Sequence, residues 1–587
     1  MNKEEEIMRC ETDSSGMPTG SIGGSQDDLL GMHLSIDDYE LFETEKQKTI
    51  EEEEQKVEKK KKKPIYKRGY CSKTFIKPFI IAILISISSF NFGANLSQMS
   101  PFAHYFKECT QDEGLFPTCW KVTNEMMWSL IISMVSGGAI IGGLIGGTLC
   151  NVVGRKIALL LTNLCCYIPG YIIMMMVSNE WGLIIGRFLA GIGVGLSTVV
   201  APMLVTELSP AKYRGEFGFL LQLMALIGFT FSLITAVPFA KMDHGFRYQQ
   251  IPLIILTLIH CITIIIIIPF SPRWMLYTRK NEKKAMAIMK YMNRSKDMDM
   301  MKKSYKEYQT KPAITIRQRL FNKDAIKPLI IGFVLTLGRQ FCGMNSFNFY
   351  LNQVFEGVGF ENPSLGGILF GFVNVGGLFI GMMFIDRLGR RAMLILGQLG
   401  IILMLCLYTI LQYFKEHSIA PTNVTSILSL LVICAYPFFY QNSLGAIPFF
   451  VIGELSTDAV RPVVSSISIA LTWFGAVIVS FVTPVFMNTL KEWAWTPWIG
   501  CTLLVLFFTI FFIPETKGKS MDVVTEETKD QVHVKGAKVV DVIEEPPKVV
   551  IDITALEKPV EEEEKPVEEE ISQLPTDLKT TLENIIV

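Results

Sequence analysis

The sequence predicts an all-α polytopic membrane protein, with twelve transmembrane helices arranged in two similar six-helix bundles. Half of the 587 residues are hydrophobic and the mean hydropathy is +0.35. Only 19% of the residues are charged, against about 25% in soluble domains. Twelve apolar runs are long enough to span a bilayer, and charged motifs recur between the two halves of the chain. These features exclude a cytosolic enzyme, a secreted disulfide-rich protein and a wholly disordered chain.

The apolar runs predict the individual spans. Every backbone N–H and C=O within a bilayer needs a partner inside the protein, so uninterrupted apolar stretches of about 20 residues indicate helices. The predicted spans cover residues 76–98, 126–150, 157–177, 182–206, 216–240, 250–269, 326–352, 364–385, 392–414, 425–450, 460–488 and 493–513. Several spans are rich in glycine, which lets helix backbones approach closely.

The positive charges between the spans predict the orientation of the chain. The connection from Arg273 to Lys327 carries 16 bases and 5 acids, and the basic run Lys59–Lys63 precedes the first span. With an even number of spans, both termini and this connection are expected in the cytosol. The polar, acidic N-terminus does not resemble a cleavable signal peptide, so the first span is expected to act as its own insertion signal.

This topology divides the chain into five parts. Charged tails at 1–70 and 516–587 are expected to be disordered and cytosolic, because they cannot bury enough apolar surface to fold. Six-helix bundles at 71–270 and 326–515 flank a partly helical cytosolic linker at 271–325. The tails are expected to act as tethers, with docking of other proteins, or of anionic membrane lipid on the basic run, as the alternative.

Cysteine usage and short motifs add few chemical sites. Cys109 and Cys119 share the predicted external loop after the first span, where a disulfide is permitted. Asn423 begins an N-glycosylation sequon in the external loop before the tenth span. No spacing of Cys and His indicates a metal, no cofactor or nucleic acid is expected, and no phosphate loop or nucleophile elbow indicates a pump or an enzyme.

Three pairs of motifs recur at offsets between 235 and 247 residues. They are Gly154-Arg155-Lys156 with Gly389-Arg390-Arg391, Glu207 and Arg214 with Glu454 and Arg461, and Ile268-Pro269 with Ile513-Pro514. We infer two bundles related by a parallel repeat, with a substrate site between them near the middle of the membrane.

The repeated motifs all fall at the cytosolic ends of the predicted spans. Glu and Arg there can form ion pairs that hold the bundles together when the cavity opens outward and that separate when it opens inward. A bias of a few kcal/mol is enough to shift such a two-state equilibrium. The alternative, that the bases only obey the positive-inside rule, does not explain the paired glutamates. The predicted gate residues are Arg155, Glu207, Arg214, Asp386, Arg390, Arg391, Glu454 and Arg461.

Taken in order, the motifs resemble those of the sugar porter family of the major facilitator superfamily, close to the animal facilitative glucose transporters. The resemblance covers about residues 76–520 and is carried by Phe92–Asn95, Asn151–Lys156, Gly186–Gly215, Pro269–Trp274, Arg339–Asn345, Asp386–Arg391, the pair Glu454 and Arg461, and Pro514–Lys519. It implies the major facilitator fold and facilitated diffusion of a small polar solute, hexose first, through a central cavity exposed to each side of the plasma membrane in turn.

The resemblance also implies a set of sugar-binding side chains. Gln222, Gln340, Asn345 and Asn374 match positions at which the family holds sugar hydroxyls with amides. An amide offers donors and an acceptor to a vicinal diol without burying a charge. For each amide alone, a hydrogen bond between helices is the alternative.

Departures from the family pattern lie at the same predicted site. Phe449 replaces a Trp and can stack on a sugar ring without an indole N–H. Gln441 stands for a Glu, and Thr472 stands for an Asn beside Trp473. Proton-linked members carry an Asp where this chain has Asn95, and an amide cannot cycle a proton, which favours uniport.

Arg339 occupies a position where the family has a glutamine. An arginine inside a span is a functional-site hypothesis by default, because its burial is costly unless it faces water or a partner. One interpretation is that Arg339 lines the cavity and favours an anionic or strongly polar solute, and the other is that it pairs with a carbonyl. At the cytosolic end, Val152 and Phe270 replace charged family residues, which predicts a weaker gate.

Three hypotheses follow. The first is a facilitative carrier for a hexose or related polyol, and the second is an organic-anion uniporter in which Arg339 is the charge partner. The third is a nutrient receptor that signals through the tails without transport.

Overall fold

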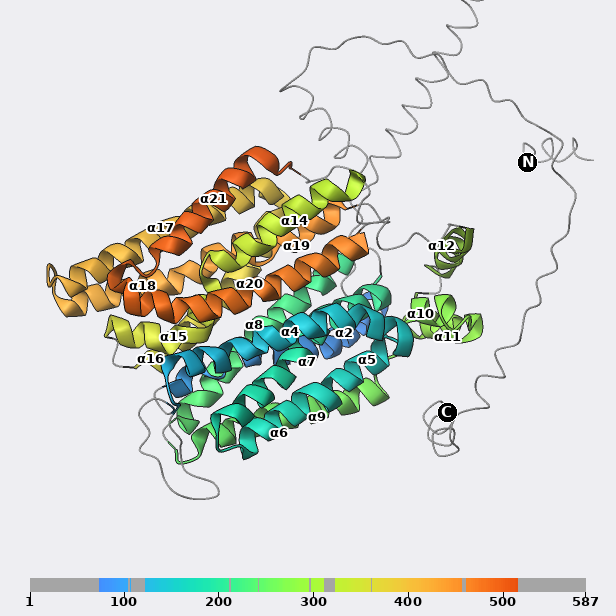
Figure 1. Cartoon of the computed structure of the whole chain (residues 1–587). Coiled ribbons are helices and arrows are strands. Elements are labelled where there is room, and N and C mark those ends of the chain that lie inside the picture. The colour runs from blue at the N-terminus through green and yellow to red at the C-terminus, as the bar shows by residue number, and fades with distance from the viewer. Residues whose placement is uncertain are drawn as a thin grey trace, which may run out of the picture. The chain divides into compact units, whose positions relative to one another are not determined.

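The computed structural model describes residues 73–103, 106, 122–210, 213–240, 242–294, 297–310, 323–359, 362–456 and 461–515. Within these ranges the chain forms helices joined by short turns, and twelve helical segments are long and apolar enough to cross a membrane. The predicted number of spans and the all-α fold are therefore confirmed (Figure 1).

The first six spans form one bundle, drawn in blue to green in Figure 1. They are α2 (Lys73–Ser97), α4 (Glu125–Val153), α5 (Arg155–Leu161) continued through the π-helical turn η2 (Thr162–Tyr167) into α6 (Ile168–Met176), α7 (Glu180–Leu208), α8 (Arg214–Phe239) and α9 (Gly245–Ile266). The short 3-10 turn η1 (Ser100–Phe102) follows α2. Asn124 and Asn179 cap α4 and α7, since their side chains accept the N–H groups of Met127 and Gly182.

The last six spans form the second bundle, drawn in yellow to red. They are α14 (Lys323–Phe341) continued by α15 (Met344–Val358), α16 (Pro363–Leu388), α17 (Arg390–Glu416), α18 (Thr422–Tyr440) continued through the π-helical turn η5 (Gln441–Gly445) into α19 (Ile447–Leu455), α20 (Arg461–Thr489) and α21 (Thr496–Phe512). The 3-10 turn η6 (Lys491–Trp493) precedes α21.

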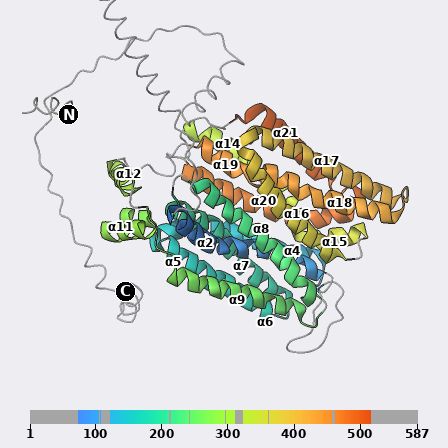
Figure 2. The same ribbon diagram turned by 180° about the vertical axis from the view of Figure 1, so that it is seen from behind.

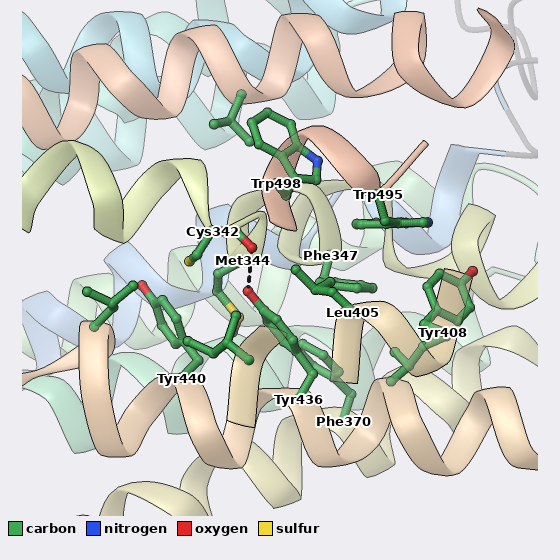
Figure 3. Close-up of a cluster of buried hydrophobic side chains, with 14 of the residues drawn as sticks. Cys342, Met344, Phe347, Phe370, Leu405, Tyr408, Tyr436, Tyr440, Trp495 and Trp498 are labelled. Atoms are coloured by element: carbon green, nitrogen blue, oxygen red, sulfur yellow. Dashed lines mark hydrogen bonds between the residues drawn. The ribbon is translucent and has the colours of Figure 1, made fainter. Parts of the chain in front are cut away.

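Two of these spans are broken where the sequence predicted a single helix. The chain turns between α14 and α15 at Gly343, whose φ of 92° is open to glycine without strain. The hydroxyl of Tyr436 donates to the carbonyl oxygen of Cys342 at 2.9 Å, so a carbonyl freed by the break finds a partner (Figure 3). Hydropathy reports removal from water and carries no information on such breaks, which explains the difference.

An aromatic cluster fills the second bundle around this break (Figure 3). The rings of Phe347 and Trp495 stack with centroids 4.4 Å apart, and Tyr436 and Trp498 pack into the same buried cluster. Aromatic packing of this kind adds stabilisation beyond the area that it buries.

Glycines bring α4 and α7 into direct backbone contact in the first bundle. A Cβ atom built on Gly138 or Gly142 would lie 2.1 or 2.2 Å from a carbonyl oxygen of α7, and one built on Gly191 or Gly195 would meet α4 at 2.3 or 2.2 Å. Only part of the glycine run serves this contact, since a Cβ on Gly147 would meet nothing within 4 Å. The two helices therefore pack as one rigid pair.

The two bundles meet along two pairs of helices, with α4 against α20 and α8 against α16. Figure 2 shows α8 and α16 side by side from behind. The second span thus packs on the eleventh and the fifth on the eighth, an exchange that the sequence repeat would produce.

Three short helices follow the first bundle, namely α10 (Pro272–Tyr277), α11 (Glu282–Tyr291) and α12 (Met298–Thr310). They share a small buried apolar cluster that includes Trp274, Met289 and Met298. The Lys302 ammonium donates a hydrogen bond to the Glu282 carboxylate, and this bond raises the pKa of Lys302. We refer to the end of the two bundles that lies next to α10–α12 as the linker end.

Candidate functional site

A cavity of about 570 Å³ lies between the bundles. Its walls come from α2, α7 and α8 on one side and from α14, α15, α16, η5, α19 and α20 on the other. All eight side chains predicted to bind solute line it, namely Gln222, Arg339, Gln340, Asn345, Asn374, Gln441, Phe449 and Trp473. Residues from five different spans are thus brought to one space.

The cavity extends toward the linker end. Thr206 and Phe219 line it from beside the turn between α7 and α8, and Ser465 lines it near the start of α20. At the opposite end the bundles are hydrogen-bonded to each other: the Asn352 N–H donates to Ser100 Oγ at 2.9 Å, and Asn488 Nδ2 donates to Glu125 Oε2 at 2.7 Å. The two bundles are therefore closed against each other at one end, and the cavity between them reaches the other end.

One group of amides on α14 and α15 forms a hydrogen-bonded ladder. Gln340 Oε1 accepts from Asn345 Nδ2 at 2.6 Å, and Asn345 Oδ1 accepts from Asn348 Nδ2 at 3.1 Å. Asn348 also lines the cavity, and its Oδ1 has no hydrogen-bond partner within the described chain. The sequence analysis missed Asn348, although its spacing of three from Asn345 places both on one helix face.

A second pair of amides joins η5 to α16. Gln441 Nε2 donates to Asn374 Oδ1 at 2.7 Å, while the buried Oε1 of Gln441 has no partner among the residues that the structure covers. The π-helical turn shifts the register of the span at this point, and such turns are frequent at functional sites. Gln222 of α8 lines the same cavity from the first bundle.

Aromatic side chains close the cavity on the side of α19 and α20. Trp473 packs edge-on against Phe92 of the first bundle, with ring centroids 5.5 Å apart. Phe449 is 40% exposed and lies in the cavity wall. Both rings offer an apolar face on which a sugar ring can stack.

Arg339 projects from α14 into the cavity wall. Its Nη1 donates to the carbonyl oxygen of Gly445, and its guanidinium lies 5.1 Å from the centre of the Phe449 ring and 6.0 Å from that of Tyr440. Arg339 therefore lines the cavity and also bonds a carbonyl, while its preference for an anionic or strongly polar solute stays a prediction.

Asn95 lies away from the cavity in a buried polar cluster. Its Nδ2 donates to the hydroxyl oxygen of Tyr171 at 2.7 Å, and its backbone carbonyl accepts from Arg187 Nη1 at 2.9 Å. Arg187 is fully buried and also reaches the carbonyl of Ile132 at 3.4 Å. An Asp at position 95 would stand beside this guanidinium, whereas the amide present here has no proton to exchange.

Four of the predicted gate residues form two ion pairs in the structure. Arg155 Nη2 lies 3.1 Å from Glu207 Oε1, and Arg390 Nη2 lies 3.2 Å from Glu454 Oε1. Each pair joins helices of the same bundle, so in this state neither pair bridges the bundles as the sequence analysis expected of a closed gate. The cavity reaches this end, which is the arrangement in which bridging pairs are separated.

The remaining gate residues differ from expectation or fall outside what is described. Arg391 makes no ion pair among the described residues. Its Nη2 donates instead to the carbonyl oxygen of Ile510 at 2.6 Å. The side chains of Arg214, Asp386 and Arg461 lie outside the described atoms. The sequence analysis missed Glu515, whose carboxylate accepts the N–H groups of Arg390 at 2.9 Å and Arg391 at 3.1 Å.

The covalent sites stay predictions. Cys109 and Cys119 lie outside the described residues. Asn423 is exposed but belongs to the first turn of α18 rather than to a loop, and Thr425 of the sequon is buried with its hydroxyl donated to the carbonyl of Thr422. Within the described part of the chain, no group of three or more His, Cys, Asp or Glu could hold a metal ion.

Two repeated six-helix bundles around a central cavity, lined by amide and apolar side chains, define a membrane carrier of the major facilitator fold. Solved structures have the same fold: the inward-open xylose transporter XylE from E. coli aligns with a TM-score of 0.63 at 22% identity over 77% of this chain and 99% of that chain. XylE bound to 6-bromo-6-deoxy-D-glucose, described as a proton:xylose symporter, also gives 0.63 at 21% identity, over 77% and 99%. A family model described as sugar (and other) transporter matches residues 77–527, so the chain belongs to that family.

Curated relatives support the same assignment. The chain is 28% identical over 476 residues to solute carrier family 2, facilitated glucose transporter member 3, of Rattus norvegicus, covering 77% of this chain and 93% of that protein. Member 1 of Gallus gallus is 28% identical over 436 residues, covering 71% and 87%. The resemblance inferred from the sequence motifs is therefore confirmed at the level of the family.

Proposed function

We propose that the protein is a uniporter that carries a hexose or a related polyol across the plasma membrane by facilitated diffusion, with both termini cytosolic. The observation that carries this proposal is the convergence of amides on one cavity. Six amide side chains from four spans line it, namely Gln222, Gln340, Asn345, Asn348, Asn374 and Gln441. Amides match sugar hydroxyls in donor and acceptor capacity.

The proposal of uniport rests on the absence of a site for a coupled proton. Among the described residues that line the cavity there is no carboxylate, and Asn95 beside Arg187 is an amide. Relatives with facilitated glucose transport in their names support this proposal, while the symporter XylE is the nearest alternative in mechanism.

Alternating access would proceed from the state described here. Closure of the linker end would bring the two bundles together there, and the hydrogen bonds from Asn352 to Ser100 and from Asn488 to Glu125 at the other end would break. The first of these hydrogen bonds is buried and the second is exposed, and a difference of a few kcal/mol between the two states is enough to shift such an equilibrium.

Flux through the full-length protein in proteoliposomes tests this proposal. We expect saturable uptake of radiolabelled glucose down its gradient, and no accumulation driven by a pH gradient. Asn345→Leu should lower the flux about tenfold, because one amide of the ladder is lost and its partners stay buried. Gln412→Leu, on α17 outside the cavity, is the matched control. Hexose accumulation against a gradient, driven by protons, would contradict uniport.

An organic-anion carrier is the second candidate, because Arg339 lines the cavity. A receptor without transport is the third, and robust flux in the same proteoliposomes would exclude it.

A further inference from the structure

Arg339 gives the cavity an unbalanced positive charge. It is the one charged side chain among the described residues that line the cavity. The acids Glu207 and Glu454 lie at the linker end, where each already pairs with an arginine. A concave, partly apolar site with charge of one sign attracts solutes of the opposite sign.

The surroundings of Arg339 hold the guanidinium in place without neutralising it. The carbonyl of Gly445 accepts from Nη1, and the rings of Phe449 and Tyr440 lie within 6.0 Å. No carboxylate of the described chain pairs with it, and its buried Nε has no hydrogen-bond partner there. A cation kept this deep in a span without a counter-ion is costly, so a bound anion would offset the cost.

The geometry of the group selects the kind of anion. A guanidinium presents its N–H donors in a planar fork that matches the two oxygens of a carboxylate, and such pairs form strong, directional hydrogen bonds. Simple carboxylates would satisfy Arg339 but would leave the rest of the cavity wall unused.

Two acceptors in the rest of the cavity wall are available to hydroxyl groups. The carbonyl oxygens Asn348 Oδ1 and Gln441 Oε1 are buried without a partner in the described chain, so both can accept from solute O–H donors. Buried unsatisfied acceptors of this kind are uncommon in folded proteins and are expected to find partners. The volume of about 570 Å³ falls within the usual range for small-molecule sites, about 300–1,000 Å³.

We infer that the solute is a polyhydroxylated carboxylate, a sugar acid such as a hexuronate. Arg339 binds its carboxylate, and the amides Asn345, Asn348 and Gln441 bind its hydroxyls. This inference rests on the proposed carrier function and replaces the neutral hexose by its acidic relative. The transported species then carries one negative charge, so its uniport moves charge across the membrane.

Two readouts test the inference in proteoliposomes of the full-length protein. We expect radiolabelled glucuronate to be taken up with saturation, to be competed by gluconate, and to resist competition by equal lactate. An inside-positive potential, set with a potassium gradient and valinomycin, should accelerate glucuronate uptake and leave glucose uptake unchanged. Arg339→Gln should lower glucuronate flux between about 10- and 100-fold, the range of a charge-assisted hydrogen bond. Arg273→Gln, at an exposed linker position, is the matched control.

Each outcome separates this inference from the carrier proposal. Glucose flux without glucuronate flux in the wild type would overturn the inference of a sugar-acid substrate and leave the proposed carrier function intact. No flux of either solute would contradict both the inference and the proposed function. Unchanged glucuronate flux in Arg339→Gln would also overturn the role of Arg339. If that variant loses both fluxes, Arg339→Lys decides, because retained preference for glucuronate supports the inference and preference for glucose contradicts it.

Discussion

The two bundles carry the same turn motif at the linker end but stabilise it with different chemistry. In the second bundle the Glu515 carboxylate accepts the backbone N–H groups of Arg390 and Arg391 at the start of α17. In the first bundle the matching position is Phe270, and its ring lies 4.9 Å from the Lys156 ammonium. A carboxylate at a helix N-terminus is favoured by the helix dipole and by the free N–H groups there. A phenyl ring carries no negative charge and no acceptor for those N–H groups.

The backbone around both motifs is nevertheless alike. Gly154 and Gly389 have φ values of 88° and 90°, and the basic residues two positions later donate to equivalent carbonyls, Lys156 to Ile265 and Arg391 to Ile510. A Cβ on Gly154 would meet the Trp274 ring at 3.0 Å, and one on Gly389 would meet Glu515 at 2.6 Å. The comparison teaches that the repeat preserves the path of the chain while its chemistry has diverged.

The ion pairs beside the two motifs should differ most on mutation. The side chains of Arg155 and Glu207 are 10% and 9% exposed, against 19% and 35% for Arg390 and Glu454. Glu207→Gln leaves a buried arginine unpaired and should cost about 3 kcal/mol. Glu454→Gln breaks a wetter pair and should cost about 1 kcal/mol. Thermal unfolding in detergent measures both.

The double variant Arg155→Gln with Glu207→Gln provides the control for that prediction. Removal of both charges should recover part of the loss, since no buried charge remains without a partner. Equal shifts in melting temperature for the two glutamate variants would show that burial of the pairs does not set their strength.

Loss of the Glu515 carboxylate should have an intermediate effect. Glu515→Ala removes two charge-assisted hydrogen bonds from the first turn of α17, and capping interactions of this type contribute about 1–2 kcal/mol. The melting temperature should fall in this variant and stay close to the wild-type value in Glu492→Ala, at the other end of the last span. An unchanged melting temperature in Glu515→Ala would mean that water replaces the carboxylate without loss.

Installing the missing carboxylate in the first bundle should have the smallest effect. Phe270→Glu places an acceptor near the N–H groups of Arg155 and Lys156, while it removes the ring beside the Lys156 ammonium. We expect a net gain of about 0.5 kcal/mol or slightly more, because the cap outweighs one exposed cation–π contact. A lower melting temperature would show that packing of the phenyl ring matters more than the cap.

Much of the fold could be predicted from the sequence, for physical reasons that particular residues illustrate. Hydrocarbon requires long apolar helices, so the second predicted span, 126–150, corresponds to α4 at Glu125–Val153. The break at Gly343 and the π-helical turn Gln441–Gly445 were missed. Both depend on tertiary partners, such as Tyr436 bonding Cys342, that no local pattern contains.

The site was predicted through family motifs rather than through geometry. Motif positions placed Gln340 and Asn345 correctly in the cavity wall, whereas Asn348 falls outside the motif and was overlooked. Glu515 was quoted within a motif, but its bonds to the backbone of α17 arise only when the last span packs against the ninth. Which group pairs with a charged side chain depends on how the helices pack, so the local sequence alone does not identify it.

The glycine contact between α4 and α7 has a mechanical consequence. At this contact the backbones of the two helices touch directly. No side chains lie between them whose conformational changes could absorb a displacement. A displacement of α4 against α20 would therefore also displace α7, together with Glu207 near the C-terminal end of α7. One added methyl group at Gly142 or Gly195 would force the two helices apart.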